Sequence, residues 1–532
     1  MTGAGATGAG ATRIGAGVAD LPDEVDLVVV GLGVTGAGVA LDAATRGLRV
    51  LAVDAHDLAF GTSRWSSKLV HGGLRYLAHG QVGVAHESAV ERGVLMEVTA
   101  PHLTRAMPMV IPLSSGVTGA QGGVARAGLW AGDLLRRAAG TDRETLPRPR
   151  RISTEETLRL APGLRRAGLR GGLLSWDGQL EDDARLVVTL ARTAAARGAL
   201  VRTRARVERA RGDGVVLRDG LTGATHHVRA AAVVNATGVW AGDVDDEVRL
   251  RPSRGTHLVL RADTLPGLTA TVTAPVPGET NRFVMVIPQP DGTLYVGLTD
   301  EPVEGPVPDV PEPTEPEVGF LLDVVAAAFE RPLRRNDVVG AFAGLRPLLD
   351  VAPAPGTGED GGGPGRTADL SRRHAVLTSA SGVVTVVGGK LTTYRRMAED
   401  AVDAALVASP GLAGRAGPCV TRSTPLLGAA DRTTLASLEQ PRRLVRRYGT
   451  DAALVLDTAR QVTGFGDEEL LAPAAPGVPV CLAELVFGVT HEGAVDVDDL
   501  LDRRTRVGLV PADRALAEPL ARRALALASP SR

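Results

Sequence analysis

Cysteine and lysine are both scarce in this chain of 532 residues. The two cysteines, Cys419 and Cys481, lie far apart without a neighbouring CxxC, which argues against a disulfide scaffold and against structural zinc. No apolar run approaches the roughly 18 residues of a membrane-spanning helix, and the formal net charge of −2 comes without a basic arm. The composition therefore predicts a protein of a reducing cytoplasm, with no metal centre and no nucleic acid as partner.

The scarcity of lysine makes the remaining lysines informative. Only two of the 59 basic residues are lysines, Lys68 and Lys390, and the rest are arginines. A compact ammonium on a flexible stem differs from a guanidinium in shape and hydration, so a lysine in such an arginine-rich chain indicates a specific requirement. We therefore predict that both lysines lie beside a bound cofactor or substrate.

Glycine, in contrast, is abundant, and three glycines fall in a βαβ pattern near the amino end. Residues 27–30 are an apolar run of strand length, an alanine-rich helical stretch follows, and a second strand, 49–53, precedes an acid. The first glycine permits a tight turn, the second lets backbone approach a pyrophosphate, and the third lets helix and strand pack closely. The acid can accept hydrogen bonds from a ribose diol and disfavours NADP. This pattern predicts a site for NAD or FAD that contains Gly31, Gly33, Gly36 and Asp54.

Two further glycine turns favour FAD over NAD. The stretch VVNATGVW (233–240) is a strand that ends in a turn containing Gly238, and VVGGKLTTYRR (386–396) places a strand, two glycines and a helix start together. A helix N-terminus can present N–H groups and a positive dipole to the negative charge of reduced flavin. Each turn alone is an ordinary strand–turn–helix connection, but together they favour a flavin beside Gly389, Lys390, Leu391 and Thr392.

The rest of the chain divides into regions of different character. We expect helices over 84–100, 183–197 and 318–329, and an antiparallel sheet within 256–300. Residues 113–150 are hard to assign. Residues 1–24 read as a flexible tail and 352–367 as a low-complexity insertion, and the chain beyond 430 is mainly helical.

A family resemblance becomes specific at DLAFGTSRWSSKLVHGGLRYL (57–77). Together with GGKLTTYRRMAE, RGTHLVL, FVMVIP, GLTD and AGLRPLL, this block resembles the FAD-dependent glycerol-3-phosphate dehydrogenases of the aerobic, respiratory type. The resemblance covers about residues 25–405, with a looser helical match after 430. The chain departs from the family pattern at Asp54, where a glutamate is usual, and at Leu298, where threonine is common.

The resemblance implies an α/β chain with three domains. A Rossmann-like FAD-binding domain is interleaved with an antiparallel-sheet substrate domain, and a helical C-terminal domain follows. The expected boundaries are 25–95, 170–250 and 370–405 for the FAD domain, 96–169 and 251–351 for the substrate domain, 352–369 for the insertion and 410–532 for the helical domain.

The resemblance also implies a reaction and its residues. The family oxidises sn-glycerol 3-phosphate to dihydroxyacetone phosphate by hydride transfer to FAD, and passes electrons to membrane quinone at the cytoplasmic face of the cell membrane. The residues that match its flavin segment are Thr62, Ser63, Ser67, Lys68, Leu69, His71 and Gly72. Those that match its substrate contacts are Arg75, Tyr76, His257, Arg346 and Lys390.

The chemistry of the substrate agrees with these residue types. A phosphate dianion needs fixed positive charge, which Arg75 and Arg346 can provide through their planar guanidinium groups. Loss of the C2 hydroxyl proton needs a base with a pKa near neutrality, for which histidine is the obvious type. His257 is the first candidate, and His71 the alternative, which we expect against the flavin.

The sequence leaves other functions open. A glycerol-3-phosphate oxidase would use the same residues but reduce O2 to hydrogen peroxide, and a flavin amine or 2-hydroxy-acid oxidase would share the fold. A non-catalytic flavoprotein could use its C-terminal helices to bind a partner. The basic segment 441–447 (PRRLVRR) is a candidate for peripheral membrane contact, and the resemblance allows a homodimer.

Overall fold

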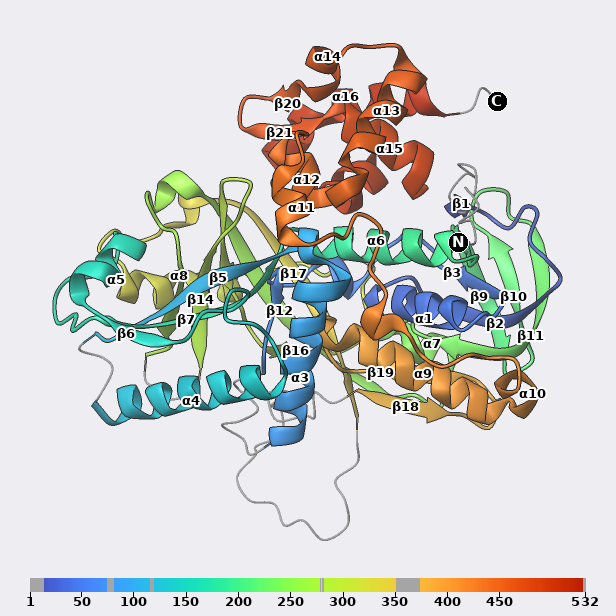
Figure 1. Ribbon diagram of the computed structural model, residues 1–532, viewed down its shortest axis with the longest axis horizontal. Coiled ribbons are helices and arrows are strands. Elements are labelled where there is room, and N and C mark those ends of the chain that lie inside the picture. Colours follow the sequence, from blue (N-terminus) through green and yellow to red (C-terminus); the bar gives the residue numbers. More distant parts are fainter. Residues whose placement is uncertain are drawn as a thin grey trace, which may run out of the picture.

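The computed structural model describes residues 14–73, 81–114, 119–277, 279, 282–350 and 374–529. Two sheets lie side by side with helices against them, and a helical domain stands on one edge of this pair (Figure 1). The architecture is α/β overall, with a sheet for the dinucleotide, a second sheet and a helical C-terminal domain, and confirms the fold class predicted from the sequence.

The first sheet is built from three separate parts of the chain. Its order is β1-β8-β3-β2-β11-β10-β9, and β19 pairs with β11 and with β18. The pairs β2–β3, β3–β8, β2–β11 and β11–β19 are parallel, as expected for strands linked through helices. The strands are β1 (Ile14–Ala16), β2 (Glu24–Val30), β3 (Val50–Val53), β8 (Leu200–Thr203), β9 (Ala205–Arg211), β10 (Gly214–Asp219), β11 (Thr225–Asn235), β18 (Ala375–Thr378) and β19 (Val384–Val387).

Three helices share the main core with this sheet: α1 (Val34–Thr45), α6 (Asp183–Ala196) and α9 (Tyr394–Ala408). Helix α1 packs between α6 and α9, which its small residues permit, since Gly38 approaches the ring of Tyr394 closely. The strands of the βαβ unit are apolar on both faces because both are covered, as in other parallel sheets.

The second sheet has the order β16-β12-β15-β14-β13-β5-β7-β4, with β17 beside β12 and β6 beside β7. The run β12–β15–β14–β13 is antiparallel, as the sequence predicts, while β13 and β5 are parallel. Helix α8 (Glu315–Ala328) buries its apolar side against this sheet. The strands are β4 (Leu69–Val70), β5 (Thr104–Pro112), β6 (Arg150–Ile152), β7 (Gly172–Leu180), β12 (Leu250–Arg261), β13 (Thr271–Pro275), β14 (Phe283–Pro288), β15 (Thr293–Gly297), β16 (Glu301–Pro302) and β17 (Val338–Leu349).

The remaining helices flank the sheets or form the C-terminal domain, which has its own core around Leu485 and Phe487. The flanking helices are α3 (Val82–Val94), α4 (Gly119–Ala138), α5 (Thr154–Leu160), α7 (Ala241–Val244) and α10 (Pro410–Ala413). The C-terminal domain contains α11 (Arg432–Ser437), α12 (Arg442–Tyr448), α13 (Ala452–Thr463), α14 (Asp467–Leu471), α15 (Leu482–Glu492) and α16 (Pro511–Ala528), with a hairpin of β20 (Pro473–Ala475) and β21 (Val478–Cys481).

Several boundaries differ from those predicted. Ile14–Ala16 is an edge strand paired with β8, so the expectation of a flexible tail is wrong for this part, while 1–13 lie outside the described residues, as does the insertion 352–369. Strands β4 and β7 belong to the second sheet, whereas the expected boundaries place their residues in the FAD domain. Alternation with period two cannot say which sheet a strand joins, because pairing partners are distant in sequence.

The basic segment 441–447 is partly buried. Leu444 is 1% exposed, and the fully buried Arg447 forms ion pairs with Asp182 and Glu484. Arg442 stays exposed and Arg443 and Arg446 partly exposed, so membrane contact through this segment stays a prediction, with one of its four arginines engaged inside the protein. Within the described part of the chain, we find no helix that is long and apolar enough to cross a membrane.

Candidate active site

The GxGxxG turn lies between β2 and α1 and is closed to side chains. Gly31 has φ +95°, and a Cβ there would lie 2.7 Å from the carbonyl oxygen of Ala236. A Cβ at Gly36 would lie 1.8 Å from the carbonyl oxygen of Gly31. Gly33 is the N-cap residue of α1, so the first N–H groups of the helix face the cavity end of β2. The turn therefore brings backbone close to the cavity at a helix N-terminus, which favours an anion, and the small hydroxyl of Ser63 is the side chain found there.

Asp54 follows β3 and lines the same cavity. Its carboxylate accepts hydrogen bonds from the backbone N–H groups of Leu32, at 2.7 Å, and His56, at 2.8 Å. Burial raises the pKa of Asp54 to about 6 despite these two bonds. At neutral pH the group is mostly ionised and can accept hydrogen bonds from a ribose diol, as the sequence predicts.

The two further glycine turns meet this cavity as well. Gly238 follows β11 with φ +63°, and Asn235 fixes the turn by accepting hydrogen bonds from the N–H and hydroxyl of Thr237. Gly389 has φ +69°, and a Cβ there would lie 2.4 Å from the sulfur of Met397. Both turns line the cavity, the second with Gly389, Lys390, Leu391 and Thr392 before the start of α9.

The segment between β3 and β4 forms another wall of the cavity. The hydroxyl of Thr62 donates to the carbonyl of Leu345 at 2.6 Å, and the hydroxyl of Ser63 accepts from the N–H of Val34 at 2.9 Å, at the start of α1. Ser67 Oγ lies 2.8 Å from His257 Nε2. These bonds join the segment to β17, α1 and β12, so one short stretch connects the dinucleotide turn with the second sheet.

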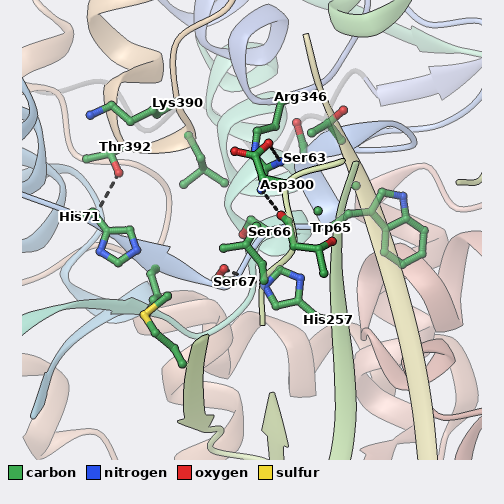
Figure 2. Close-up of a pocket in the computed structure, with 18 of the residues that line it drawn as sticks. Ser63, Trp65, Ser66, Ser67, His71, His257, Asp300, Arg346, Lys390 and Thr392 are labelled. Carbon is green, nitrogen blue, oxygen red and sulfur yellow. Dashed lines mark hydrogen bonds and ion pairs between the residues drawn. The ribbon is translucent and has the colours of Figure 1, made fainter. Parts of the chain in front are cut away.

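His71 and His257 both line the cavity but in different environments (Figure 2). His257 is 1% exposed and stacks on Phe342 with ring centroids 4.8 Å apart, and among the described residues its Nδ1 has no hydrogen-bond partner. Burial, together with Lys68 and Arg346, lowers the pKa of His257 to about 3. The side chain of His71 is 41% exposed, and its Nδ1 lies 3.1 Å from Asp177 Oδ2.

Asp177 holds the end of the flavin segment in place. Its Oδ1 accepts hydrogen bonds from Arg92 Nη1 at 2.7 Å and from the N–H of Gly72 at 3.2 Å. Burial raises the pKa of Asp177, but Arg92 and His71 lower it further, to about 2. The carboxylate is therefore ionised, and its contact with Nδ1 fixes the orientation of the partly exposed His71 ring.

The cationic groups of the cavity are fixed by hydrogen bonds. Arg346 on β17 donates from Nη1 to Asp300 at 2.9 Å and to Ser253 at 3.1 Å, and from Nη2 to the carbonyl of Thr299 at 3.1 Å. Lys390 donates to the hydroxyl of Ser88 on α3. In the view of Figure 2, Lys390 and His71 lie on one side of the pocket, while Arg346 and His257 lie on the other.

Most of the residues predicted from the sequence meet in this one cavity, whose volume is about 2760 Å³. Such a volume exceeds the roughly 300–1,000 Å³ of a site for one small ligand, and suits a dinucleotide together with a substrate. Gly36 and Gly72 do not line the cavity but lie directly behind its lining, where close packing leaves no room for a side chain. Arg75 and Tyr76 lie outside the described residues and stay predictions.

Lys68 departs from the prediction. Its side chain is fully buried and does not line the cavity, since Nζ donates to the carbonyl of Arg64 at 2.7 Å and to Asp183 at 3.0 Å. The prediction that this ammonium contacts a bound ligand is therefore wrong, whereas Lys390 does line the cavity. Sequence reasoning treated both lysines alike because neither burial nor the distant Asp183 can be read from local context.

Sequence reasoning also missed the acids that hold the site together, Asp177 and Asp300. Asp300 belongs to the GLTD motif but received no role, and Asp177 lies within the apolar strand β7. A carboxylate inside an apolar strand is costly unless it is paired, and this is the signal that could have identified Asp177. The described residues contain no group of three or more His, Cys, Asp or Glu side chains that could hold a metal ion.

The fold and the three glycine turns define a dinucleotide-binding oxidoreductase, and comparison with known proteins specifies the class. The model of the family described as FAD dependent oxidoreductase matches residues 26–395. The model described as the C-terminal domain of alpha-glycerophosphate oxidase matches residues 419–529. FAD is the cofactor of this class, and the cradle of Gly31, Gly33 and Asp54 fits it.

Relatives over nearly the whole length narrow the class further. The chain is 52% identical to glycerol-3-phosphate dehydrogenase 1 of Mycobacterium tuberculosis, over 92% of each chain. It is 36% identical to a mitochondrial glycerol-3-phosphate dehydrogenase of Arabidopsis thaliana, over 93% of this chain and 81% of that protein. The chain therefore belongs to the FAD-dependent glycerol-3-phosphate dehydrogenase family.

Solved structures agree with this assignment. The glycerol-3-phosphate dehydrogenase of Bacillus halodurans complexed with FAD superimposes with a TM-score of 0.68 at 28% identity, over 94% of this chain and 91% of that chain. An L-alpha-glycerophosphate oxidase of Mycoplasma pneumoniae with FAD bound shares the fold, with a TM-score of 0.56 at 18% identity, over 76% of this chain and 99% of that chain.

Proposed function

We propose that this enzyme oxidises sn-glycerol 3-phosphate to dihydroxyacetone phosphate and passes the electrons through FAD to a membrane quinone. The observation that carries the proposal is that a single cavity runs from the dinucleotide turn at Gly31 to the cations Arg346 and Lys390 and the imidazole of His71. A phosphate dianion with an adjacent secondary alcohol matches cations next to a proton acceptor. The names of the relatives at 52% and 36% identity support the same substrate.

The cofactor contacts follow from the cavity wall. The N-terminus of α1 and the turn of Gly31 and Gly33 would hold the pyrophosphate, and Asp54 the ribose. The turn of Gly389 and Lys390, at the start of α9, would face the flavin ring. When bound, FAD accepts the hydride from C2 of the substrate, and the protein must take the proton of the C2 hydroxyl.

Binding of the phosphate would fall to Arg346 and Lys390. Arg346 is held in one orientation by Asp300, Ser253 and the carbonyl of Thr299, so little freedom is lost when it meets a ligand. Lys390 brings positive charge from the other wall, at the start of a helix whose dipole has the same sign. We expect Arg75 and Tyr76 to add to this set, as the family resemblance implies.

We assign the uptake of the C2 hydroxyl proton to His71. The sequence instead makes His257 the first candidate for this base and His71 the alternative. A neutral His71 with its proton on Nδ1 donates to Asp177, which leaves Nε2 as the acceptor on the exposed side of the ring. The carboxylate then stabilises the imidazolium that forms when the proton is taken. His257 suits this role less, because its Nε2 is bonded to Ser67 and its low pKa makes it a weak base.

An oxidase that reduces O2 is the second candidate, because the family model that matches residues 419–529 carries the name of an oxidase. The two functions share the cavity and differ in the electron acceptor. We propose the quinone, and with it a peripheral position at the cytoplasmic face of the cell membrane, on the strength of the dehydrogenase relatives.

An anaerobic titration of the purified holoenzyme tests the proposal. Glycerol 3-phosphate should bleach the visible band of oxidised flavin with a stoichiometry of one substrate per flavin, while glycine and lactate leave it unchanged. A soluble quinone added without O2 should restore the band. Bleaching by an amino acid or a hydroxy acid alone would overturn the substrate, and rapid peroxide release in air with slow quinone turnover would favour the oxidase.

A further inference from the structure

Residues 57–68, which we call the wall segment, have two distinct sides. Gly61, Thr62, Ser63, Trp65, Ser66 and Ser67 line the cavity. The three charged residues of the same segment point away from it, with exposed fractions of 0% for Asp57, 5% for Arg64 and 0% for Lys68. Buried charges are costly unless they are paired, so the partners of these three show what the wall segment is fastened to.

The beginning of the wall segment is bound to the C-terminal domain. Arg504 donates from both terminal nitrogens to the two oxygens of Asp57, at 2.8 and 2.9 Å, and Arg503 donates from Nε at 2.6 Å. Burial raises the pKa of Asp57, but Arg504 and Arg503 lower it further, well below its usual range. Both arginines belong to the helical turn Asp499–Arg504, and all three side chains are almost completely buried.

The end of the wall segment is bound to the start of α6. Asp183 Oδ2 accepts hydrogen bonds from Lys68 Nζ at 3.0 Å, from the N–H of Ser66 at 2.9 Å and from the hydroxyl of Ser66 at 2.7 Å. The neighbouring Asp182 accepts both terminal nitrogens of Arg447 at 3.1 Å, from α12 of the C-terminal domain. Figure 1 shows this domain standing over α6.

The backbone of Lys68 shows how strongly its position is determined. Lys68 has φ +57°, a left-handed conformation that a residue with a side chain rarely adopts. Such a conformation persists only where the surroundings fix it. The fixing contacts are the bonds of Lys68 to Asp183 and to the carbonyl of Arg64, and they place Ser67 within 2.8 Å of His257 in the cavity.

We infer that the C-terminal helical domain positions the cavity wall for flavin and substrate, with Asp57 and Lys68 as the two points at which the wall segment is held. Arg503 and Arg504 hold Asp57 at the start of the wall segment, and Arg447 holds Asp182, the chain neighbour of the Asp183 that binds Lys68. None of these three arginines lines the cavity. Asp57 and Lys68 are positioning residues, since they act through Thr62, Ser63 and Ser67. The inference deepens the proposed function and rests on it only where turnover is measured.

Two variants test the two attachment points. Arg503→Gln removes one of the two cations at Asp57 and leaves the bidentate pair with Arg504, while Lys68→Met keeps the length of the side chain and removes its charge. Arg460→Gln is the matched control, because this arginine of α13 pairs with Asp457 and Asp467 at the surface. For each variant the dissociation constant of FAD, the visible circular dichroism of bound flavin, and kcat and KM are measured at a temperature where the apoprotein is folded.

We expect Arg503→Gln and Lys68→Met to bind FAD more weakly, to change the visible circular dichroism and to lower kcat by on the order of tenfold to a hundredfold, with the control unchanged. Arg503→Lys should recover part of the FAD affinity and decides the matter if Arg503→Gln does not fold. Folded variants with wild-type FAD affinity and an unchanged flavin spectrum would overturn the inference. If glycerol 3-phosphate does not bleach the flavin of the wild-type enzyme, the proposed function is overturned, while the comparison of FAD affinities between the variants stays valid.

Discussion

The two ends of the cavity are formed by different kinds of chemical groups. The dinucleotide end consists of backbone and glycines, where a Cβ at Gly31 or Gly36 would strike a carbonyl oxygen. The other end, where we propose that the substrate binds, consists of polar and charged side chains that hold one another, such as Arg346 with Asp300 and His71 with Asp177. The first end depends on excluded volume and the second on electrostatic pairing, so they should respond differently to mutation and to pH.

The largest effect is expected from Gly36→Ala. Its Cβ would lie 1.8 Å from the backbone oxygen of Gly31, which cannot give way without moving the turn. We expect purified protein without the yellow colour of bound flavin. Gly319→Ala on α8 is the matched control, because a Cβ there meets nothing within 4 Å and the exchange should be neutral or stabilise a helix by about 0.5–1 kcal/mol. Full FAD occupancy in Gly36→Ala would show that the turn tolerates a side chain.

The next effect compares the two histidines. His71→Gln removes the proposed proton acceptor and should lower kcat by about 10²–10⁴-fold, with FAD still bound. His257→Gln keeps a hydrogen-bond partner for Ser67 and should lower kcat less. Single-turnover reduction of the flavin by glycerol 3-phosphate measures both rates directly. A larger loss in His257→Gln than in His71→Gln would return the role of base to His257.

The smallest effect is a pH dependence at the dinucleotide end. Burial gives Asp54 a pKa of about 6 in the folded apoprotein, above the 3.8 of the unfolded chain. The folded state therefore binds more protons between these values, and this group's contribution to the free energy of unfolding falls as pH rises through that window. Protonated Asp54 accepts hydrogen bonds from a ribose poorly, so FAD affinity should fall a few-fold below about pH 6. Fluorescence titrations of wild type and Asp54→Asn check this, since the variant should lose the dependence.

The contrast between the two ends also explains what the sequence could predict. Gly31, Gly33, Gly36 and Asp54 act within one βαβ unit, and their spacing alone predicted their arrangement. The family blocks predicted that His257, Arg346 and Lys390 share one cavity, which they line. Side-chain pairs between residues far apart in the sequence could not be predicted from local patterns. Asp177 and His71 are 106 residues apart, and Asp183 and Lys68 are 115 residues apart. The error at Lys68 and the missed role of Asp177 have this common cause.

The order of strands in the first sheet has a consequence for synthesis of the chain. Strands β2 and β3 emerge from the ribosome early, but β19 and α9, which complete this layer, follow more than 300 residues later. At about 5–20 residues per second, that delay is on the order of tens of seconds. The side of α1 that packs on α9 is uncovered during this time. We expect nascent chains to depend on a chaperone in this interval, and to acquire the cofactor only after the last strand of the sheet is in place.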